Sequence, residues 1–251
     1  MRSHLSRFAN DENFQESMDI THLGNVRLLA LIKSTRKHGK DFANEHPEAI
    51  IIGTDPNIRF EIEDCTGPWT FEPNSFDYIH MRFLLDSIDD WGLLIRREFE
   101  ACESGGYIES FEPPSYLENE DGSVTDTMAM GQWGKLFTED GCKMGRSFEV
   151  YQQGTVRAAL KAAAFVDIYE QDFKAPIGGW PKDAYRKQIG EFTRIGFLQD
   201  PEGYLVFLVH TMGWKREQTP VFLAHLKREL RSPKVHTFYR QKVLWASKPE
   251  A

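Results

Sequence analysis

The sequence predicts an α/β fold with a mostly parallel sheet covered by helices, and three observations support this class. Short apolar runs of strand length alternate with segments whose apolar residues recur at helical spacing, with turn signals between them. Acidic residues follow two of the predicted strands, at the sheet edge where α/β folds bind ligands. The last two predicted strands flank a long helical stretch, and late strands of this kind often form an antiparallel edge pair. Together these features indicate a doubly wound sheet.

The first half of the chain supplies most of the predicted sheet. The apolar run at residues 25–32 is interpreted as either a buried strand or a helix end. Glycines at 105–106 predict a turn before the last strand of this half. The remaining elements are strands at 49–53, 59–62, 76–81 and 107–111, and helices at 41–46 and 91–102.

The second half is richer in helices. Strands are predicted at 165–173 and 236–246, and helices at 125–144, 155–164, 184–211 and 219–231. We therefore expect a polar N-terminal arm at 1–24 and a single domain over 25–251. A helical insert at about 175–232 separates the two late strands and could form a lid or a partner surface.

Composition excludes several classes of function. The 251 residues carry a net charge of −8, which argues against non-specific nucleic-acid binding. The three cysteines are widely spaced and show no CxxC pattern, so we expect reduced thiols and no metal site. No apolar run approaches the length of about 18 residues that suggests a membrane span. The N-terminal residues are polar, and we expect no secretory signal and a cytoplasmic or nuclear location.

Three carboxylates at predicted strand ends are candidate ligand-binding residues. Asp55 follows the strand at 49–53, where a carboxylate can accept hydrogen bonds from ribose hydroxyls. Glu63 and Asp64 follow the strand at 59–62, where a carboxylate can receive an adenine amino group. The alternative for all three is a solvated acidic turn, because Asp is common in turns.

His80 and Arg82 end the strand at 76–81 and are the candidate catalytic residues. His80 could act as a general base, and Arg82 could hold an anionic group. The alternatives are a hydrogen-bonded structural histidine and a structural ion pair. No GxSxG, HExxH or GxxxxGK[S/T] pattern is present, so hydrolase, zinc-protease and P-loop functions have no support.

Residues 33–40 form the most basic stretch, with four Lys or Arg side chains together with His38. The stretch lies between the first predicted strand and the first predicted helix, where a phosphate or nucleoside loop normally sits. It could bind an anionic ligand or partner, or it could be a solvated basic turn.

Seven segments of the chain together form a recognisable pattern. They are DFANEHPEAIIIGTD, RFEIEDCTGPWTFEPNSFDYIHMR, DSIDDW, GGYIESFE, GRSF, PIGGWPKD and HTFYRQKVLW. In combination they resemble fungal methyltransferase-like proteins of secondary metabolism, the family that includes the velvet-complex regulator, over residues 10 to 249 approximately.

The resemblance implies a class I methyltransferase fold, S-adenosylmethionine as methyl donor, and an acceptor that is a small-molecule biosynthetic intermediate or a protein partner. By position, Asp55 would meet the donor's ribose, Glu63 or Asp64 its adenine, and His80 and Arg82 would line the site.

The sequence departs from the family at the loop that holds the methyl donor. The family's first strand ends in an acidic residue and a GxGxG-type run. Without gaps, Ala30 takes the acidic position, and Ile32, Ser34 and Arg36 take the glycine positions. Glycines let the backbone approach the donor closely, and these side chains would fill that volume. Three interpretations stay open: a rebuilt donor site, a fold that has lost the donor, and a coding sequence that omits the loop.

Overall fold

The computed structural model describes residues 27–32, 50–52, 65–82, 84–85, 87–199, 201–202, 205, 211–215 and 217–250. The expected N-terminal arm at 1–24 and the basic stretch at 33–40 lie outside these residues. The same holds for the helix expected at 41–46 and the strand expected at 59–62.

A six-stranded sheet organises the described part of the chain, in the order β2-β1-β3-β4-β6-β5. β1, β2, β3 and β4 pair in parallel, whereas β6 runs antiparallel to both β4 and β5. The expected late antiparallel pair is therefore present. The strands are β1 (Arg27–Ile32), β2 (Ile50–Ile52), β3 (Phe76–Arg82), β4 (Cys102–Glu112), β5 (Val166–Ile177) and β6 (Thr237–Ser247).

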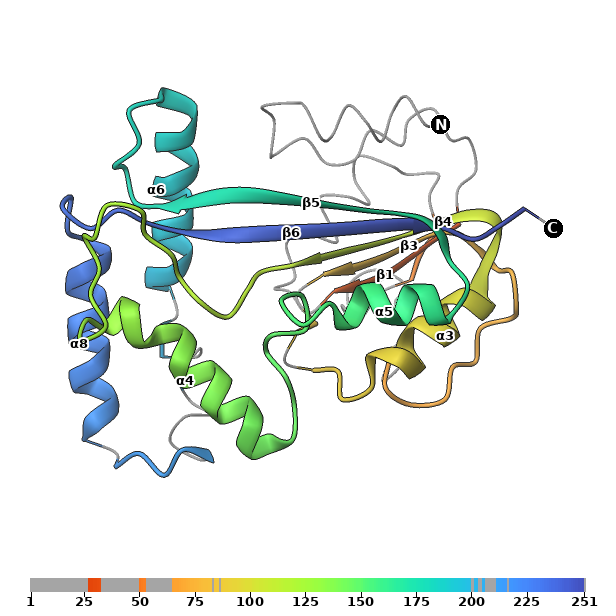
Figure 1. Ribbon diagram of the computed structural model, residues 1–251, viewed down its shortest axis with the longest axis horizontal. Helices are drawn as coiled ribbons and strands as arrows, with labels where there is room; N and C mark the ends of the chain where they lie inside the picture. The colour runs from red at the N-terminus through yellow and green to blue at the C-terminus, as the bar shows by residue number, and fades with distance from the viewer. Residues whose placement is uncertain are drawn as a thin grey trace.

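The described helices form two groups (Figure 1). α3 (Trp91–Ala101) and α5 (Thr155–Ala162) lie side by side below the sheet. α4 (Ala129–Met144), α6 (Ala184–Gln199) and α8 (Gln218–Leu230) gather at the left of the picture, around the far ends of β5 and β6. α6 and α8 fall between β5 and β6 in sequence, within the range expected for the helical insert.

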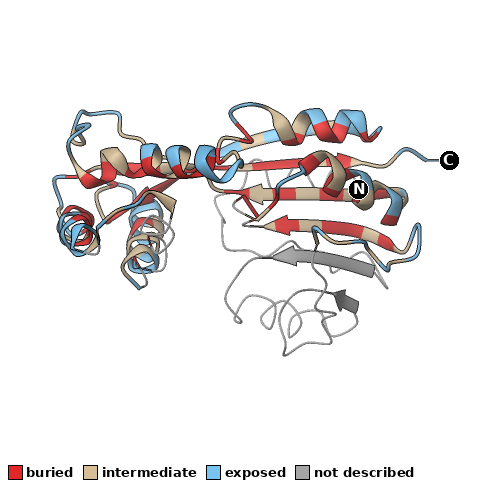
Figure 2. Cartoon of the chain, turned by 90° about the horizontal axis from the view of Figure 1, so that it is seen from below, coloured by how far each residue is buried: buried red, intermediate tan, exposed pale blue. Residues whose placement is uncertain are grey.

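The first core cluster lies between the sheet and the helices α3 and α5. Ile79 and Met81 of β3 and Ile108 of β4 are at most 1% exposed and contribute its sheet side. Ile95 of α3 and Leu160 of α5 contribute its helix side. Figure 2 shows the buried residues running along the strands and on the inner sides of these helices. Apolar burial of this kind is the main favourable term in folding.

A second core cluster joins α4 to α8 and to the ends of β5 and β6. Met130 of α4 and Leu226 of α8 are buried in it together with Ile177, the last residue of β5. Glu229 of α8 accepts hydrogen bonds from the backbone N–H groups of Ala129 (3.1 Å) and Met130 (2.9 Å). The first N–H groups of a helix have no partner within the helix, so this carboxylate caps α4 from a neighbouring helix.

Two expected elements differ from the structure. The helix expected at 184–211 was wrong in its length, because α6 ends at Gln199, two residues before Pro201. Proline disfavours helical backbone at the residue before it, which places the helix end here. The turn expected at Gly105–Gly106 was also wrong, because these residues lie within β4, where its pairing with β3 shifts register. Gly105 has a φ of +75°, so the glycines form a bulge.

Gly190 brings α6 against the turn that follows β5. The Gly178 N–H donates a hydrogen bond to the Gly190 carbonyl at 2.8 Å. A Cβ atom at Gly190 would lie 2.1 Å from the Gly178 carbonyl oxygen, which is backbone and cannot rotate away. Gly196 lies two turns further along α6, and nothing would come within 4 Å of its Cβ.

We therefore expect opposite effects from the same substitution at these two positions. Gly190→Ala should lower the free energy of unfolding by about 1–3 kcal/mol, because α6 must shift away from the turn. Gly196→Ala is the matched control and should raise it by about 0.5–1 kcal/mol through helix propensity. Urea denaturation followed by circular dichroism measures both. Equal effects of the two variants would contradict the close contact.

Glu98 of α3 is a fully buried carboxyl group. Its side chain is 0% exposed, and neither carboxyl oxygen has a hydrogen-bond partner among the described residues. Burial raises the pKa of Glu98 well above its ordinary value. The fold thus favours the protonated form, so stability is highest below the pKa of the unfolded chain and falls as the pH rises towards the folded pKa.

Glu98→Met should stabilise the protein at neutral and alkaline pH. The change removes an unsatisfied buried polar group, and we expect a gain of about 1–3 kcal/mol at pH 8. The gain should shrink towards pH 4, where the wild-type carboxyl group is protonated in both the folded and unfolded states. Thermal unfolding at the two pH values tests this. A variant less stable than wild type at pH 8 would show that the carboxylate has a stabilising partner.

Candidate functional site

The candidate site lies on one face of β3 and β4, towards their carboxyl ends. The two strands are parallel, and Tyr78, His80 and Arg82 pair in register with Tyr107, Glu109 and Phe111. Paired residues in a sheet point to the same face, and alternate residues along a strand point to opposite faces. These six side chains therefore share a face. Ile79, Met81 and Ile108 occupy the other face and pack in the core with α3 and α5.

His80 lies beside a carboxylate that the sequence did not reveal. The distance between His80 Nδ1 and Glu109 Oε1 is 3.1 Å, and each side chain is 14% exposed. The atoms are close but are not aligned as a hydrogen bond, so the contact becomes an ion pair when the imidazole is protonated. Among the described residues the polar contact of the ring is through Nδ1, and a histidine can exchange a proton through either of its two ring nitrogens.

Tyr78 completes this cluster from the same strand. Its hydroxyl group hydrogen-bonds the Glu109 side chain, and its ring stacks near the His80 ring with 6.4 Å between centroids. Burial, together with the negative charge of Glu109, raises the pKa of Tyr78 well above its usual range. Tyr78 is therefore a neutral phenol that donates to Glu109 and helps to fix the carboxylate in place.

Arg82 follows on the same face. Its guanidinium carbon lies 4.7 Å from the centroid of the Phe111 ring, within the range of a cation–π contact. Burial lowers the pKa of Arg82, while Tyr239, Glu109 and Glu112 oppose this shift. Arginine remains protonated under such conditions, so Arg82 places a partly buried positive charge beside the His80–Glu109 pair.

Glu112, the last residue of β4, anchors the segment that follows β3. Its side chain is 0% exposed, and its two carboxylate oxygens accept hydrogen bonds from the backbone N–H groups of Leu84 (2.8 Å) and Leu85 (3.1 Å). A buried carboxylate with two backbone donors is well satisfied. Glu112 therefore fixes where the chain goes after Arg82, at the carboxyl edge of the sheet.

The residues expected to bind a methyl donor fall only partly within the structure. Asp55, Glu63 and Asp64 lie outside the described residues. At the end of β1, Ala30 pairs with His80 and Ile32 pairs with Arg82. Ile32, which an alignment without gaps would put at the family's first glycine position, is an extended strand residue. In the same alignment Ala30 takes the acidic position, and its side chain cannot accept a hydrogen bond, so β1 itself lacks the acceptor that the resemblance implies.

The described residues were also searched for metal-binding groups and for helices that could span a membrane. No group of three or more His, Cys, Asp or Glu side chains among them could hold a metal ion. None of the helices in the described part is long and apolar enough to cross a membrane.

The sequence named His80 and Arg82 as candidates, and the structure adds Tyr78, Glu109 and Glu112 beside them, which the sequence did not single out. A partial signal was present, because Tyr78, His80 and Arg82 alternate in FDYIHMR, and Tyr107 and Glu109 alternate in GYIESFE. Alternation alone does not give the register between two strands, and the register decides which carboxylate meets His80.

No protein-family model matches the chain. It is 28% identical to the probable methyltransferase tdiE of Emericella nidulans, over 84% of this chain and 68% of that protein. It is 26% identical to the methyltransferase pytC of Aspergillus terreus, over 96% of this chain and 83% of that protein. It is 30% identical to the secondary metabolism regulator laeA of Gibberella zeae, over 76% of this chain and 61% of that protein.

The chain is related to these fungal methyltransferases and LaeA-type regulators of secondary metabolism. Solved structures agree on the methyltransferase-like fold. Phosphoethanolamine N-methyltransferase 2 of Haemonchus contortus, in complex with S-adenosylhomocysteine, superposes with a TM-score of 0.52 at 18% identity. That likeness covers 90% of this chain and 49% of the nematode protein, so the chain spans about half its length. The cyclase SpnF superposes with a TM-score of 0.50 at 14% identity, over 91% of this chain and 77% of SpnF.

Glu112→Gln should destabilise the protein by about 1–3 kcal/mol, because the amide has one acceptor oxygen and its NH₂ group would face a backbone N–H. Chemical denaturation measures the loss. Glu100→Gln, at an exposed position of α3, is the control and should change stability by less than about 0.5 kcal/mol. A Glu112 variant as stable as this control would contradict the anchoring role.

Proposed function

We propose that this chain methylates a small-molecule intermediate of a fungal secondary-metabolite pathway, with His80 as the general base. The observation that carries the proposal is the His80–Glu109 contact, at 3.1 Å, near the carboxyl ends of two parallel strands of a methyltransferase-like fold. Ligands of such sheets bind outside these strand ends. The family's curated fungal methyltransferases support the reaction class.

The residues of the site suit the removal of a proton from an acceptor hydroxyl or amine. His80 would take the proton on the nitrogen that does not contact Glu109, and the Glu109 carboxylate would stabilise the resulting imidazolium. Tyr78 would hold that carboxylate through its hydroxyl group. Arg82 would orient a polar or anionic part of the acceptor. S-adenosylmethionine, when bound, would supply the electrophilic methyl group.

A second candidate function is favoured by the end of β1. Ile32 continues the strand opposite Arg82 where the family has a glycine turn, and the sequence lacks the other glycines as well. The alignment with pytC spans 271 positions, which exceeds the 251 residues of this chain, so it contains gaps in this chain. In this alternative the protein has lost donor binding. It would instead act as a cyclase or isomerase that positions a reactive intermediate, or as a regulatory protein that binds a partner in the cytoplasm or nucleus.

Calorimetric titration with S-adenosylmethionine and S-adenosylhomocysteine separates the two functions. The methyltransferase proposal predicts micromolar binding, about −8 kcal/mol. Asp55→Ala should weaken this binding by about tenfold or more, because a ribose hydroxyl would lose a charged acceptor. His80→Gln should leave the affinity within about twofold, because we assign His80 to the acceptor.

The outcomes are distinct. Folded wild-type protein that binds neither compound would contradict the methyltransferase proposal and favour the function without donor binding. Binding that is lost in the His80 variant but kept in the Asp55 variant would contradict the roles assigned to these two residues. It would leave methyl transfer as the proposed activity. A cyclase or isomerase would convert its pathway intermediate with no donor present, and a regulatory protein would copurify with a partner instead.

A further inference from the structure

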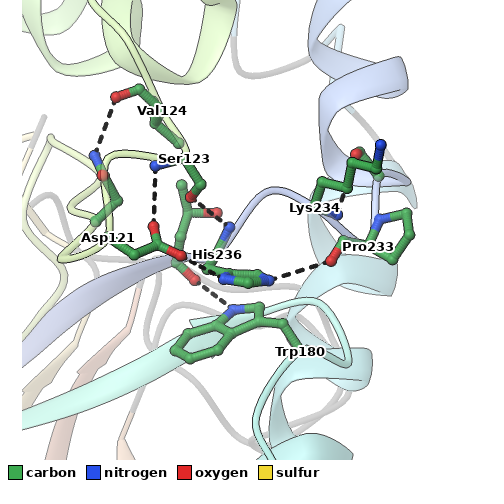
Figure 3. A network of polar contacts seen from close by, with 10 residues as sticks. Asp121, Ser123, Val124, Trp180, Pro233, Lys234 and His236 are labelled. Atoms are coloured by element: carbon green, nitrogen blue, oxygen red, sulfur yellow. Dashed lines mark hydrogen bonds and ion pairs between the residues drawn. The ribbon is translucent and has the colours of Figure 1, made fainter.

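A cluster of polar contacts around His236 lies outside the candidate site and joins three segments that are distant in sequence (Figure 3). His236 lies in the connection from α8 into β6, immediately before Thr237. Asp121 and Ser123 come from the segment between β4 and α4, and Trp180 comes from the loop between β5 and α6. The three segments lead into α4, into α6 and out of α8.

Both ring nitrogens of His236 face groups that only accept hydrogen bonds. Nδ1 lies 2.5 Å from Asp121 Oδ2, and Nε2 lies 3.2 Å from the Pro233 carbonyl oxygen. A neutral imidazole carries one N–H and can donate to only one of them. The doubly protonated ring donates to both, so the geometry is fully satisfied only when His236 carries a positive charge.

An aromatic ring lies over the imidazole. The Trp180 ring stacks on the His236 ring with 5.3 Å between centroids and 28° between planes. Trp180 is fixed in turn, because its Nε1–H donates to the Thr237 carbonyl at 3.0 Å. An aromatic face stabilises a cation placed over it. The stack thus holds the loop before α6 against the start of β6.

Asp121 is fixed on its other side by the turn that it begins. The Ser123 N–H donates to Asp121 Oδ1 at 3.0 Å, and the His236 N–H donates to Ser123 Oγ at 2.9 Å. Hydrogen bonds from Ser123, together with the neighbouring His236, lower the pKa of Asp121 to about 2. The carboxylate is therefore ionised throughout the pH range in which histidine changes its charge.

Charged residues also stand beside His236 and Trp180 in the sequence. Lys234 belongs to the same connection as His236, and its backbone N–H donates to Ser232 Oγ. Lys182 and Asp183 follow Trp180, and the Asp183 carboxylate accepts a hydrogen bond from the Arg186 N–H at the start of α6. Asp121 is thus the carboxylate that contacts the imidazole.

We propose that His236, Asp121 and Trp180 form a pH-sensitive clasp. With the imidazole protonated, the clasp holds the segment before α4, the loop before α6 and the connection into β6 together. When the imidazole is neutral, one of its two acceptors loses its donor and the cation–π attraction disappears, so the three segments loosen. The clasp sets how firmly the helical insert is attached to the ends of β5 and β6.

Hydrogen exchange measured by mass spectrometry tests the clasp at pH 6.0 and pH 8.5, after correction for the intrinsic pH dependence of exchange. In wild-type protein, protection of peptides covering 118–128 and 178–184 should be about two- to fivefold lower at pH 8.5, the range expected for a part-exposed ion pair. His236→Gln and Asp121→Asn should show the lower protection at both pH values.

His225→Gln is the matched control, because the His225 ring contacts Arg228 on the exposed side of α8 and should leave the pH dependence unchanged. Two substitutions are used so that failure of one to fold leaves the other informative. Wild-type protection that is equal at the two pH values would overturn the proposal. So would an Asp121→Asn variant that keeps the wild-type pH dependence in both peptides.

Discussion

β3 and β4 lie side by side in parallel, and their register controls both the core and the candidate site. Ile79 pairs with Ile108 on the face that packs with α3 and α5, while His80 pairs with Glu109 on the opposite face. Because the side-chain period of a strand is two, a shift of one residue would move Glu109 away from His80 and bring Ile108 out of the core. The apolar core therefore enforces the register that brings His80 beside Glu109.

Buried carboxylates have two different roles in this fold. Glu112 and Glu229 each accept hydrogen bonds from two backbone N–H groups, and each ties a segment to an element far away in sequence. Glu98 is equally buried but has no hydrogen-bond partner among the described residues, and burial raises its pKa. A carboxylate with two donors stabilises the fold, whereas one without donors is tolerated because it can take up a proton.

Local patterns in the sequence predict most of the elements but not how they meet. The strands β2 to β6 and the helices α3, α5 and α8 were predicted because apolar periodicity and turn residues are local signals. The run that forms β1 stayed open between a strand and a helix end, because a short apolar run suits both. The helix predicted at 184–211 was too long, because its apolar spacing outweighed the single stop signal at Pro201. His80 was found as a strand-end histidine, but its contact with Glu109 depends on register, which is a property of two strands brought together in space.

The arrangement of charges around His80 bears on what the site can do. Arg82 and Glu109 lie on the face of β3 and β4 that also carries His80, and their charges are opposite in sign. A proton taken up by His80 would place an imidazolium 3.1 Å from the Glu109 carboxylate. An opposite charge at this distance stabilises a cation. A proton removed from an acceptor would therefore be held by a charge that the register of β3 and β4 already places beside the imidazole, whether the protein transfers a methyl group or only positions an intermediate.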